Sequence, residues 1–227
     1  MITQNTLFNR QESVNLDKLT NETVMKSISY DQIEIIKWIL RLYCPSGIDV
    51  DVTYSKGNFY KTITEPKYKF DLNPQTSDTV KADFCHLPLK DNSVNSIMFD
   101  PPFTGGVPVT HKIGSNIVSN RFSSYWDMKE LFKSYYNAMS EFYRVLSDNG
   151  VLIFKCQDTI LSGKQYFVHV NIINKAYELG FYPKDLFVLL AKNVVLGHAG
   201  GYTKQYHARK FHSYFLVFLK QKSPVNY

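Results

Sequence analysis

Four acidic residues follow four short apolar segments in the first half of the chain, and together their side chains could bind a ligand. Asp51 and Asp71 stand at the ends of the first two segments, and Asp83 and Asp100 follow the next two. In an open α/β sheet the carboxyl ends of the strands form the ligand crevice. Each acid taken alone is equally an ordinary turn or cap residue. Because one acid follows each of four consecutive segments, the four together indicate a site that accepts hydrogen bonds from hydroxyl and amino groups.

The last of these acids opens the tetrapeptide Asp100-Pro101-Pro102-Phe103, which directly follows the apolar stretch 94–99. This tetrapeptide resembles the catalytic motif of enzymes that methylate amino groups of nucleic-acid bases. Such an amino group is a poor nucleophile because its lone pair delocalises into the ring. A carboxylate and the peptide carbonyl of Pro101 can accept its two N–H groups and aim the lone pair at a methyl donor. Proline fixes φ and has no N–H, which holds these oxygens rigidly, and Phe103 offers a ring face for the base. The alternative is a plain Pro-Pro loop.

The loop after the first acid bears on the kind of cofactor. No GxGxxG turn is present to hold a phosphate, and the nearest approach is Ser55-Lys56-Gly57. Asp71 follows Asp51 by about 20 residues, which resembles the spacing from glycine loop to ribose-binding acid in dinucleotide sites. A cofactor that carries adenosine but no phosphate, such as S-adenosyl-L-methionine, therefore fits better than a dinucleotide.

From about residue 31 to about residue 220 the chain resembles amino-directed DNA methyltransferases, which use S-adenosyl-L-methionine to methylate adenine N6 or cytosine N4. The resemblance rests on the DPPF motif at residues 100–103 and the preceding series of acids. It implies an α/β fold of the class I methyltransferase type, a Rossmann-like, mostly parallel sheet with an antiparallel C-terminal strand. It also implies a target base that is flipped out or already single-stranded. Aspartate at the first motif position leans toward adenine N6 in DNA. The alternatives are an RNA base, cytosine N4, and a catalytically silent fold that binds nucleic acid.

The resemblance also implies roles for single residues. Asp51 and Gly57 would lie beside the methionine end of the cofactor, and Asp71 would bind the ribose. Asp83 would bind the adenine, with the following phenylalanine stacking on that ring. Ser55 departs from the family pattern because it stands where a glycine is common. The cofactor-binding set is thus Asp51, Thr53, Ser55, Gly57, Asp71, Asp83, Phe84 and Asp100, the catalytic set is Asp100, Pro101, Pro102 and Phe103, and no metal is implied.

The apolar periodicity predicts strands that alternate with helices. Asp31 is expected to cap the first helix, and Gly180 to end the last one. No helix is predicted between the final two strands, so the last strand should be antiparallel to the others. The predicted helices are 32–43, 128–146 and 166–179, the predicted strands are 48–53, 67–72, 80–84, 94–99, 151–155, 187–191 and 213–219, and residues 148–150 are predicted to form a turn.

Positive charge is placed where a polyanion could bind. The chain has 26 Lys and Arg against 20 Asp and Glu, and the segments 103–126 and 192–227 contain no acid. These segments favour two substrate-facing loops, 104–124 and 193–210, that contact DNA or RNA. The alternative is solvated surface basicity. Lys155 and Asp158 either line the pocket or form a solvated strand end. The residues predicted to bind nucleic acid are His111, Lys112, Arg121, Lys204, Arg209, Lys210 and His212.

Length and composition predict a single domain over residues 1–227, with residues 1–28 as an N-terminal extension, and the resemblance implies that this is a methyltransferase domain. No secretory signal and no apolar run of membrane-spanning length is visible, so no membrane partner is expected. The three cysteines form no CxxC pair, which suits a reducing cytosol and a cytoplasmic enzyme. The small size would suit an enzyme encoded by a phage or mobile element. Oligomeric state is left open.

Overall fold

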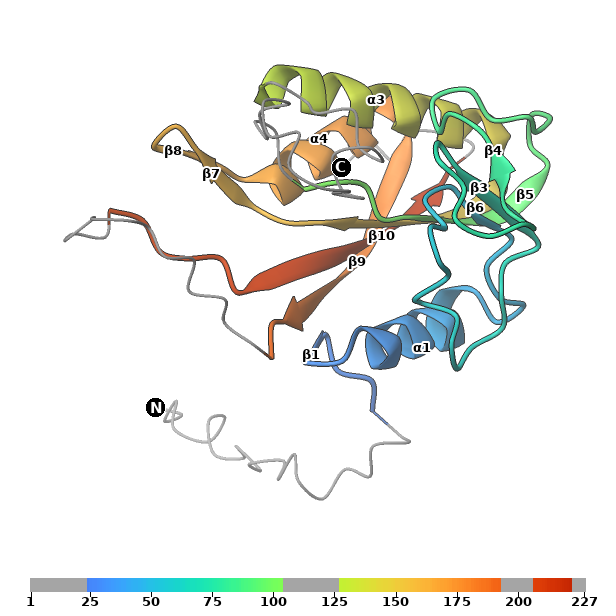
Figure 1. Ribbon diagram of the computed structural model, residues 1–227, viewed down its shortest axis with the longest axis horizontal. Helices are drawn as coiled ribbons and strands as arrows, with labels where there is room; N and C mark the ends of the chain where they lie inside the picture. Colours follow the sequence, from blue (N-terminus) through green and yellow to red (C-terminus); the bar gives the residue numbers. More distant parts are fainter. Residues whose placement is uncertain (1–23, 104–126, 193–205, 222–227) are drawn as a thin grey trace, which may run out of the picture.

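The structure, a computed structural model, describes residues 24–103, 127–192 and 206–221. Its centre is an eight-stranded sheet with the strand order β1-β9-β10-β6-β5-β2-β3-β4 (Figure 1). All neighbouring strands are parallel except where β10 pairs with β6 and β9. The strands are β1 (Ile28–Ser29), β2 (Val50–Asp51), β3 (Tyr68–Asp71), β4 (Val80–Lys81), β5 (Val94–Phe99), β6 (Leu146–Cys156), β9 (Phe181–Leu190) and β10 (His212–Lys220).

This arrangement confirms the predicted fold class. The sheet is Rossmann-like and mostly parallel, and the C-terminal strand β10 is antiparallel to both of its neighbours. Strand β5 matches its predicted bounds of 94–99. The acids at 51 and 71 end β2 and β3, while the acids at 83 and 100 follow β4 and β5. The parallel direction of these four strands therefore brings all four acids to the same edge of the sheet.

Among the described residues, three helices cover the two faces of the sheet. Helix α1 (Gln32–Tyr43) begins where predicted, because the Asp31 side chain accepts a hydrogen bond of 2.8 Å from Ile33 N. Helices α3 (Met128–Val145) and α4 (Val168–Leu179) lie together on the opposite face (Figure 1). Helix α4 ends at Gly180, whose φ of +93° favours glycine. In the described part of the chain, no helix is both long enough and apolar enough to cross a bilayer.

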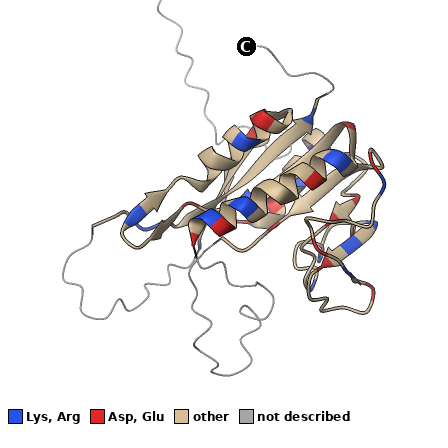
Figure 2. Ribbon diagram, turned by 90° about the horizontal axis from the view of Figure 1, so that it is seen from above, with Lys and Arg blue, Asp and Glu red and all other residues tan. Residues whose placement is uncertain are grey.

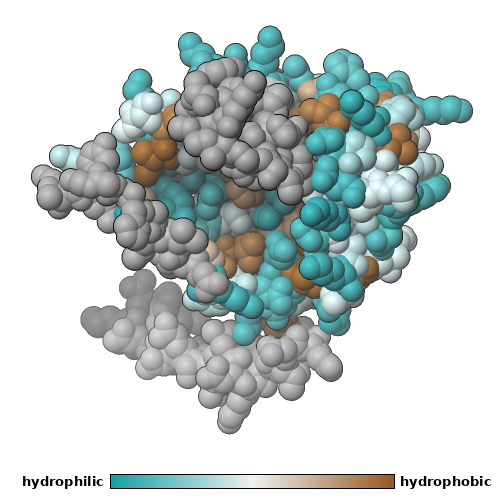
Figure 3. All heavy atoms as spheres, viewed as in Figure 1, coloured by the Kyte–Doolittle hydropathy of each residue, from teal (hydrophilic) through white to brown (hydrophobic). Residues whose placement is uncertain are grey.

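Successive side chains of a strand point to opposite faces of the sheet, so a separate hydrophobic core lies on each face. Ile153 of β6 packs toward α1, whereas Phe154 packs toward α3. The larger core is centred on Phe99, whose ring makes edge contacts with Phe142 and Phe154 at centroid distances of 5.0 and 4.8 Å. The surface in Figure 3 is mainly hydrophilic, with small, separate hydrophobic patches. The sheet is thus held from both sides, which fixes the relative positions of its strand ends.

The predicted turn at residues 148–150 is wrong, because these residues belong to β6. The strand begins at Leu146, directly after α3, and Asn149 has a φ of +63°. The pairing with β5 shifts here, from Val94 opposite Leu146 to Ser96 opposite Val151. The Asp-Asn-Gly sequence therefore forms an irregularity inside the strand rather than a turn before it.

Other predicted boundaries are also wrong. Strand β2 covers only two residues of the predicted 48–53, and β4 only two of 80–84. Strand β9 starts at Phe181 instead of 187, because Pro-Lys-Asp at 183–185 hides the apolar alternation. Helix α4 starts two residues later than predicted, because Tyr166 closes a strand.

The sequence prediction missed β1 and a small hairpin that projects from the sheet (Figure 1). The hairpin consists of β7 (Thr159–Leu161) and β8 (Lys164–Tyr166), which pair antiparallel. Its two turn residues, Ser162 and Gly163, have φ of +50° and +75°. Positive φ at both positions is the geometry that tight two-residue hairpins require, so the Ser-Gly pair was the available signal.

Candidate active site

A cavity of about 280 Å³ opens at the carboxyl ends of β2, β3 and β5. Seven of the residues predicted to form the site line it: Thr53, Ser55, Asp71, Asp83, Phe84, Asp100 and Pro102. Seven further lining residues were not predicted, mostly apolar or small residues of the loop after β2 and of α3: Val52, Tyr54, Asn58, Phe59, Leu72, Cys85 and Ser134. Four predicted residues do not line it: Asp51, Gly57, Pro101 and Phe103.

The Asp71 carboxylate is fixed at the end of β3 and still faces the cavity. Its Oδ1 accepts a hydrogen bond of 2.8 Å from Asn73 N, and its Oδ2 accepts one of 2.9 Å from Ser55 N. The second bond ties the loop after β2 to the neighbouring strand. Each carboxylate oxygen has two acceptor directions, so the same oxygens can also accept hydrogen bonds from a ligand.

Asp83 and Phe84 form a neighbouring wall of the cavity. The Asp83 side chain is 51% exposed, and its Oδ1 accepts a hydrogen bond of 2.8 Å from Cys85 N. The Phe84 ring rests on Phe99 at a centroid distance of 5.0 Å. One ring edge is therefore anchored in the core while the residue lines the cavity, an arrangement suited to stacking against a flat ligand.

Asp51 does not line the cavity. It is 1% exposed, its Oδ2 accepts a hydrogen bond of 2.7 Å from the Tyr60 hydroxyl, and its Oδ1 accepts one of 2.8 Å from Thr53 N. Burial raises the pKa of Asp51 to about 7, although the hydrogen bonds from Tyr60 and Thr53 oppose that rise. In this structure the residue supports the loop that carries Thr53.

The glycine turn after β2 is built around Tyr54. Ser55 and Gly57 both have positive φ, of 57° and 65°, and Gly57 N donates to the Tyr54 carbonyl at 2.9 Å. A Cβ at position 57 would lie 2.5 Å from the Tyr54 hydroxyl oxygen. Gly57 thus allows the tyrosine ring to pack across the turn. Ser55 occupies the left-handed conformation that favours glycine.

The segment after β5 is held at three points. Asp100 N donates to Thr53 Oγ1 at 2.8 Å, and Asp100 Oδ2 lies 3.2 Å from the Lys155 ammonium nitrogen. The Tyr135 hydroxyl of α3 donates to the Pro102 carbonyl. Within the described residues nothing donates to the carbonyl of the buried Pro101. The segment therefore holds a fixed carboxylate that lines the cavity and, next to it but outside the cavity lining, a carbonyl that can accept.

The environment of the Asp100 carboxylate has two opposing effects on its proton affinity. Burial raises the pKa of Asp100 above its ordinary value, and the charge and hydrogen bond of Lys155 lower it. Lys155 was predicted either to line the cavity or to lie at a solvated strand end, and it does neither. Its side chain is 11% exposed. The alternation of apolar residues in β6, with Phe154 on one face, was the sequence signal that the next side chain points to the other face.

Asp158 has a different environment from the one predicted. It is 4% exposed, and its Oδ1 lies 2.7 Å from His169 Nδ1 at the start of α4. The same oxygen accepts a weaker hydrogen bond from His169 N at 3.3 Å. The carboxylate thus joins the end of β6 to α4 and does not reach the cavity.

The predicted nucleic-acid-binding residues are only partly described. Of this set, Arg209 is exposed and Lys210 is half-buried. His212 is half-buried, with Nε2 at 2.8 Å from the Tyr214 hydroxyl. These residues lie beside the β7–β8 hairpin, since His207 Nε2 contacts the Gly163 carbonyl at 3.0 Å. His111, Lys112, Arg121 and Lys204, with all of the loop 104–124, lie outside the described residues.

Charge is distributed unevenly over the described surface. Lys and Arg alternate with Asp and Glu along α3 (Figure 2). The hairpin at residues 159–166 and the segment 206–212 contain Lys164, Arg209 and Lys210 but no acid. Tyr206 and Phe167 are exposed in the same region, at 77% and 56%. Basic and aromatic side chains thus occur together near the start of β10.

Comparison with known proteins identifies no family for the sequence, since no family model and no curated protein matches it. Several solved structures are similar. TTHA0409 of Thermus thermophilus, provisionally assigned as a DNA modification methylase, is 13% identical with a TM-score of 0.44, covering 70% of this chain and 56% of its own. The same protein has been crystallised with S-adenosyl-L-methionine. PvuII DNA methyltransferase, which is cytosine-N4-specific, is 12% identical with a TM-score of 0.46, covering 63% and 49%.

The [4+2]-cyclase SpnF is 12% identical with a TM-score of 0.52, covering 83% of this chain and 81% of its own. The chain spans about half the length of the two methylases above. The likeness to SpnF shows the fold alone. Because a cyclase shares that fold, the reaction must be argued from the site itself.

Proposed function

We propose that this chain is an S-adenosyl-L-methionine-dependent methyltransferase that acts on the exocyclic amino group of a nucleic-acid base, with adenine N6 in DNA as its substrate. One observation carries the proposal. Asp100 of the DPPF segment lines the same cavity as Asp71, Asp83 and Phe84. An acceptor for an amino group therefore stands beside a set of groups suited to adenosine.

The described residues fit the cofactor. Asp71, Asp83 and Phe84 line one cavity. In this proposal Asp71 accepts hydrogen bonds from the ribose hydroxyls, Asp83 accepts one from the adenine amino group, and Phe84 offers its ring to the adenine face. When bound, S-adenosyl-L-methionine supplies a methyl group on a positively charged sulfur. Asp51 contributes indirectly, because it fixes the loop of Thr53 from behind.

The chain's own contribution to the reaction is orientation. The Asp100 carboxylate and the Pro101 carbonyl accept the two N–H groups of the substrate amine and turn its lone pair toward the methyl group. With the cofactor bound, its methyl group would be supplied to this nitrogen, which would give up one proton. Asp100, which already accepts that N–H, is placed to take it. Holding the reacting groups in line supplies most of the rate enhancement for a reaction of this type.

The target base must leave its stack to reach Asp100, because the carboxylate lies in a cavity. The exposed basic and aromatic residues beside the β7–β8 hairpin, including Lys164, Arg209 and Tyr206, are suited to phosphate contacts and base stacking. DNA is preferred here over RNA on the resemblance of the DPPF motif to DNA methyltransferases. Lys204 and the basic residues of the loop 104–124 belong to the same proposal.

The test is methylation of nucleic acid with methyl-labelled cofactor, followed by digestion to nucleosides. Label in N6-methyladenine from DNA, absent with the Asp100→Ala variant, is the expected result. Label only in N4-methylcytosine would overturn the choice of base, and label only in RNA would overturn the choice of DNA. Calorimetry with S-adenosyl-L-methionine is the companion measurement. A chain that binds the cofactor but labels neither nucleic acid is not this enzyme.

A further inference from the structure

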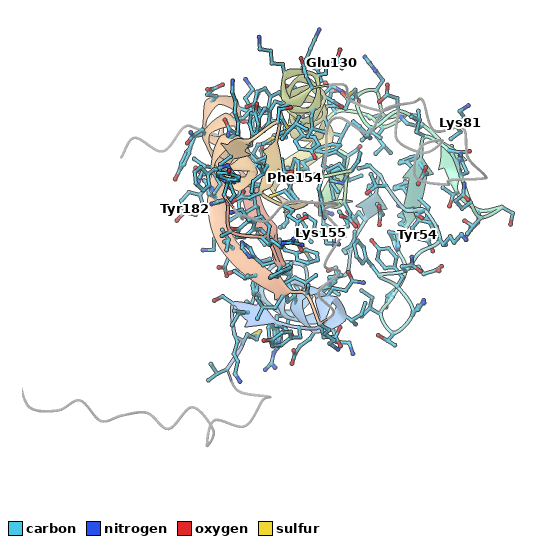
Figure 4. All side chains as sticks on the ribbon, turned by 60° about the vertical axis from the view of Figure 1, so that its left-hand side comes forward. Tyr54, Lys81, Glu130, Phe154, Lys155 and Tyr182 are labelled. Carbon is cyan, nitrogen blue, oxygen red and sulfur yellow. The ribbon has the colours of Figure 1, made fainter. Side chains whose placement is uncertain are left out.

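Lys155 is a buried lysine at the carboxyl end of β6, in the interior on the α1 side of the sheet (Figure 4). Three aromatic rings surround its ammonium nitrogen, those of Phe59 and Phe215 on this face of the sheet and that of Phe103 after β5. The distances to their centroids are 5.1, 5.5 and 5.5 Å. In the described part of the chain, its one polar partner is Asp100 Oδ2, at 3.2 Å.

This environment is unusual for a lysine that serves only the fold. Burying an ammonium group is costly unless it is paired and hydrogen-bonded, and cation–π contacts offset only part of that cost. Lys220, at the other end of the neighbouring strand β10, shows the alternative. Its ammonium group donates to two neutral oxygens, Asn92 Oδ1 and the Leu146 carbonyl, both at 2.7 Å.

Among the described residues around the Lys155–Asp100 ion pair, Lys155 is the positively charged group that faces Asp100. From β2, Asp51 is close enough to interact electrostatically with Asp100, and both are acids. From the loop after β2, Tyr60 donates to Asp51, and Thr53 accepts from the Asp100 backbone. Among the described residues that interact with Asp100, Lys155 alone therefore opposes protonation of its carboxyl group.

We propose that Lys155 is a positioning residue that keeps the Asp100 carboxylate ionised and turned toward the substrate amine. The inference rests on the proposed function. A protonated carboxyl group has an O–H donor in place of one acceptor, so it no longer receives both the amine N–H and its proton. Phe103 shares the aromatic cage, so a base stacked on its outer face would lie beside the ion pair.

The consequence is a pH dependence of methyl transfer. Burial raises the pKa of Asp100 and Lys155 lowers it, so the Lys155→Met variant should need a higher pH to ionise this carboxyl group. If the pKa of Asp100 in the variant lies one to two units above the assay pH, the ionised fraction of this carboxyl group falls by about 10- to 100-fold. Activity lost near neutral pH should then return at alkaline pH.

The experiment compares kcat/KM for methyl transfer from pH 5.5 to 9.5 in the wild type and in three variants. In Lys155→Met the rise of kcat/KM with pH should occur at a higher pH than in the wild type. In Lys155→Arg the dependence of kcat/KM on pH should be close to that of the wild type. Lys220→Met is the matched control, a buried lysine of the same sheet that is far from the cavity. Its profile should equal that of the wild type. Equal loss at every pH in Lys155→Met, or no loss at all, would overturn the proposal.

A second measurement keeps this test separate from the proposed function. The carboxyl ¹³C resonance of Asp100, assigned with Asp100→Asn, reports its ionisation without any substrate. If the titration midpoint of the Asp100 carboxyl group is higher in Lys155→Met, Lys155 keeps that group ionised. An unchanged midpoint overturns this role. If the wild type methylates neither DNA nor RNA, the proposed function fails, whereas the midpoint still decides what Lys155 does to Asp100.

Discussion

At the scale of single residues, the site depends on side chains that hold other groups in place. Thr53 and Tyr135 do not need to touch a substrate, yet one receives the Asp100 N–H and the other holds the Pro102 carbonyl. Asp51, the first acid of the sequence pattern, acts through the loop it supports. Sequence reasoning placed Asp51 beside the cofactor. The structure turns its carboxylate to Tyr60, because a buried carboxylate needs internal hydrogen-bond partners.

Asp51→Asn should change how the stability of the protein depends on pH. In the folded chain the pKa of Asp51 is about 7, whereas in the unfolded chain it is about 4. The folded state therefore retains a proton that the unfolded state releases, and this contribution is lost as pH rises from about 4 to 7. Relative to the variant, the wild type should lose roughly 4 kcal/mol of unfolding free energy over that range. Denaturant unfolding at several pH values checks it, and parallel curves for the two proteins would contradict it.

Tyr135→Phe should lower both the rate of methyl transfer and the stability, but not the affinity for the cofactor. The variant removes the hydroxyl that holds the Pro102 carbonyl and keeps the buried ring against Phe99. A lost hydrogen bond of this kind costs about 1–2 kcal/mol of unfolding free energy. Loosening the segment should lower the rate of methyl transfer by about tenfold, while affinity for S-adenosyl-L-methionine stays the same. Calorimetry and a methyl-transfer assay measure the two effects. An unchanged rate would show that the hydroxyl does not position the motif.

At the scale of elements, strand length and strand direction decide which residues meet. Strand β2 is only two residues long, which leaves residues 52–60 to form the loop that supplies much of the cavity wall. The antiparallel β10 lies between β6 and β9 and provides Phe215, one of the three rings around Lys155. The ends of α1 and α4 are set by residues that the sequence identifies on local grounds, Asp31 and Gly180.

Gly180→Ala should destabilise the end of α4. Its φ is +93°, and a Cβ there would lie 2.9 Å from the Tyr143 hydroxyl oxygen, which itself donates to the Gln221 carbonyl. Backbone strain and displacement of that tyrosine should together cost about 2–3 kcal/mol. Gly163→Ala is the matched control, since its φ is +75° but no atom lies within 4 Å. It should cost only about 1 kcal/mol, measured by thermal or denaturant unfolding. Equal losses of unfolding free energy in the two variants would show that Tyr143 can be displaced without cost.

At the scale of the whole molecule, one sheet with a core on each face holds the cavity together. Phe99 is fully buried in the α3 side of this arrangement, and the next residue is Asp100. The packing of this core and the position of the motif are therefore linked through one peptide bond. Beside the β7–β8 hairpin, Lys164, Tyr206 and Arg209 lie outside the eight-stranded sheet and belong to neither core.

Phe99→Ala should be among the most destabilising single changes in the chain. It removes a ring that contacts Phe84, Tyr135, Phe142 and Phe154. Such a cavity costs about 3–5 kcal/mol of unfolding free energy. Phe167→Ala is the control, because that ring is 56% exposed and should cost less than about 1 kcal/mol. Denaturant unfolding followed by circular dichroism measures both, and similar losses would contradict this account of the core.

Much of the architecture follows from local sequence pattern. Strand β5 and helix α1 have strong periodicity and clear end residues, so their bounds were predicted correctly. Where polar residues interrupt a strand, as at 148–150 and 183–185, the predicted start of the strand is too late. Pairing with a long neighbouring strand extends the strand through residues of poor local β-propensity. The hairpin at 159–166 was missed because its strands are three residues long and carry little pattern.

The sequence by itself determined the chemistry available: four acids at strand ends, a rigid Asp-Pro-Pro-Phe segment, and an alternation that placed strands and helices. These are local properties, set by the order of side chains along the chain. Only the tertiary structure decided which of those groups share the cavity, that Asp51 is turned away from it, and that Lys155 reaches Asp100. The contact between Lys155 and Asp100 joins residues 55 positions apart. Such contacts depend on strand register and on burial, because a buried charge must find a partner wherever the packed sheet offers one.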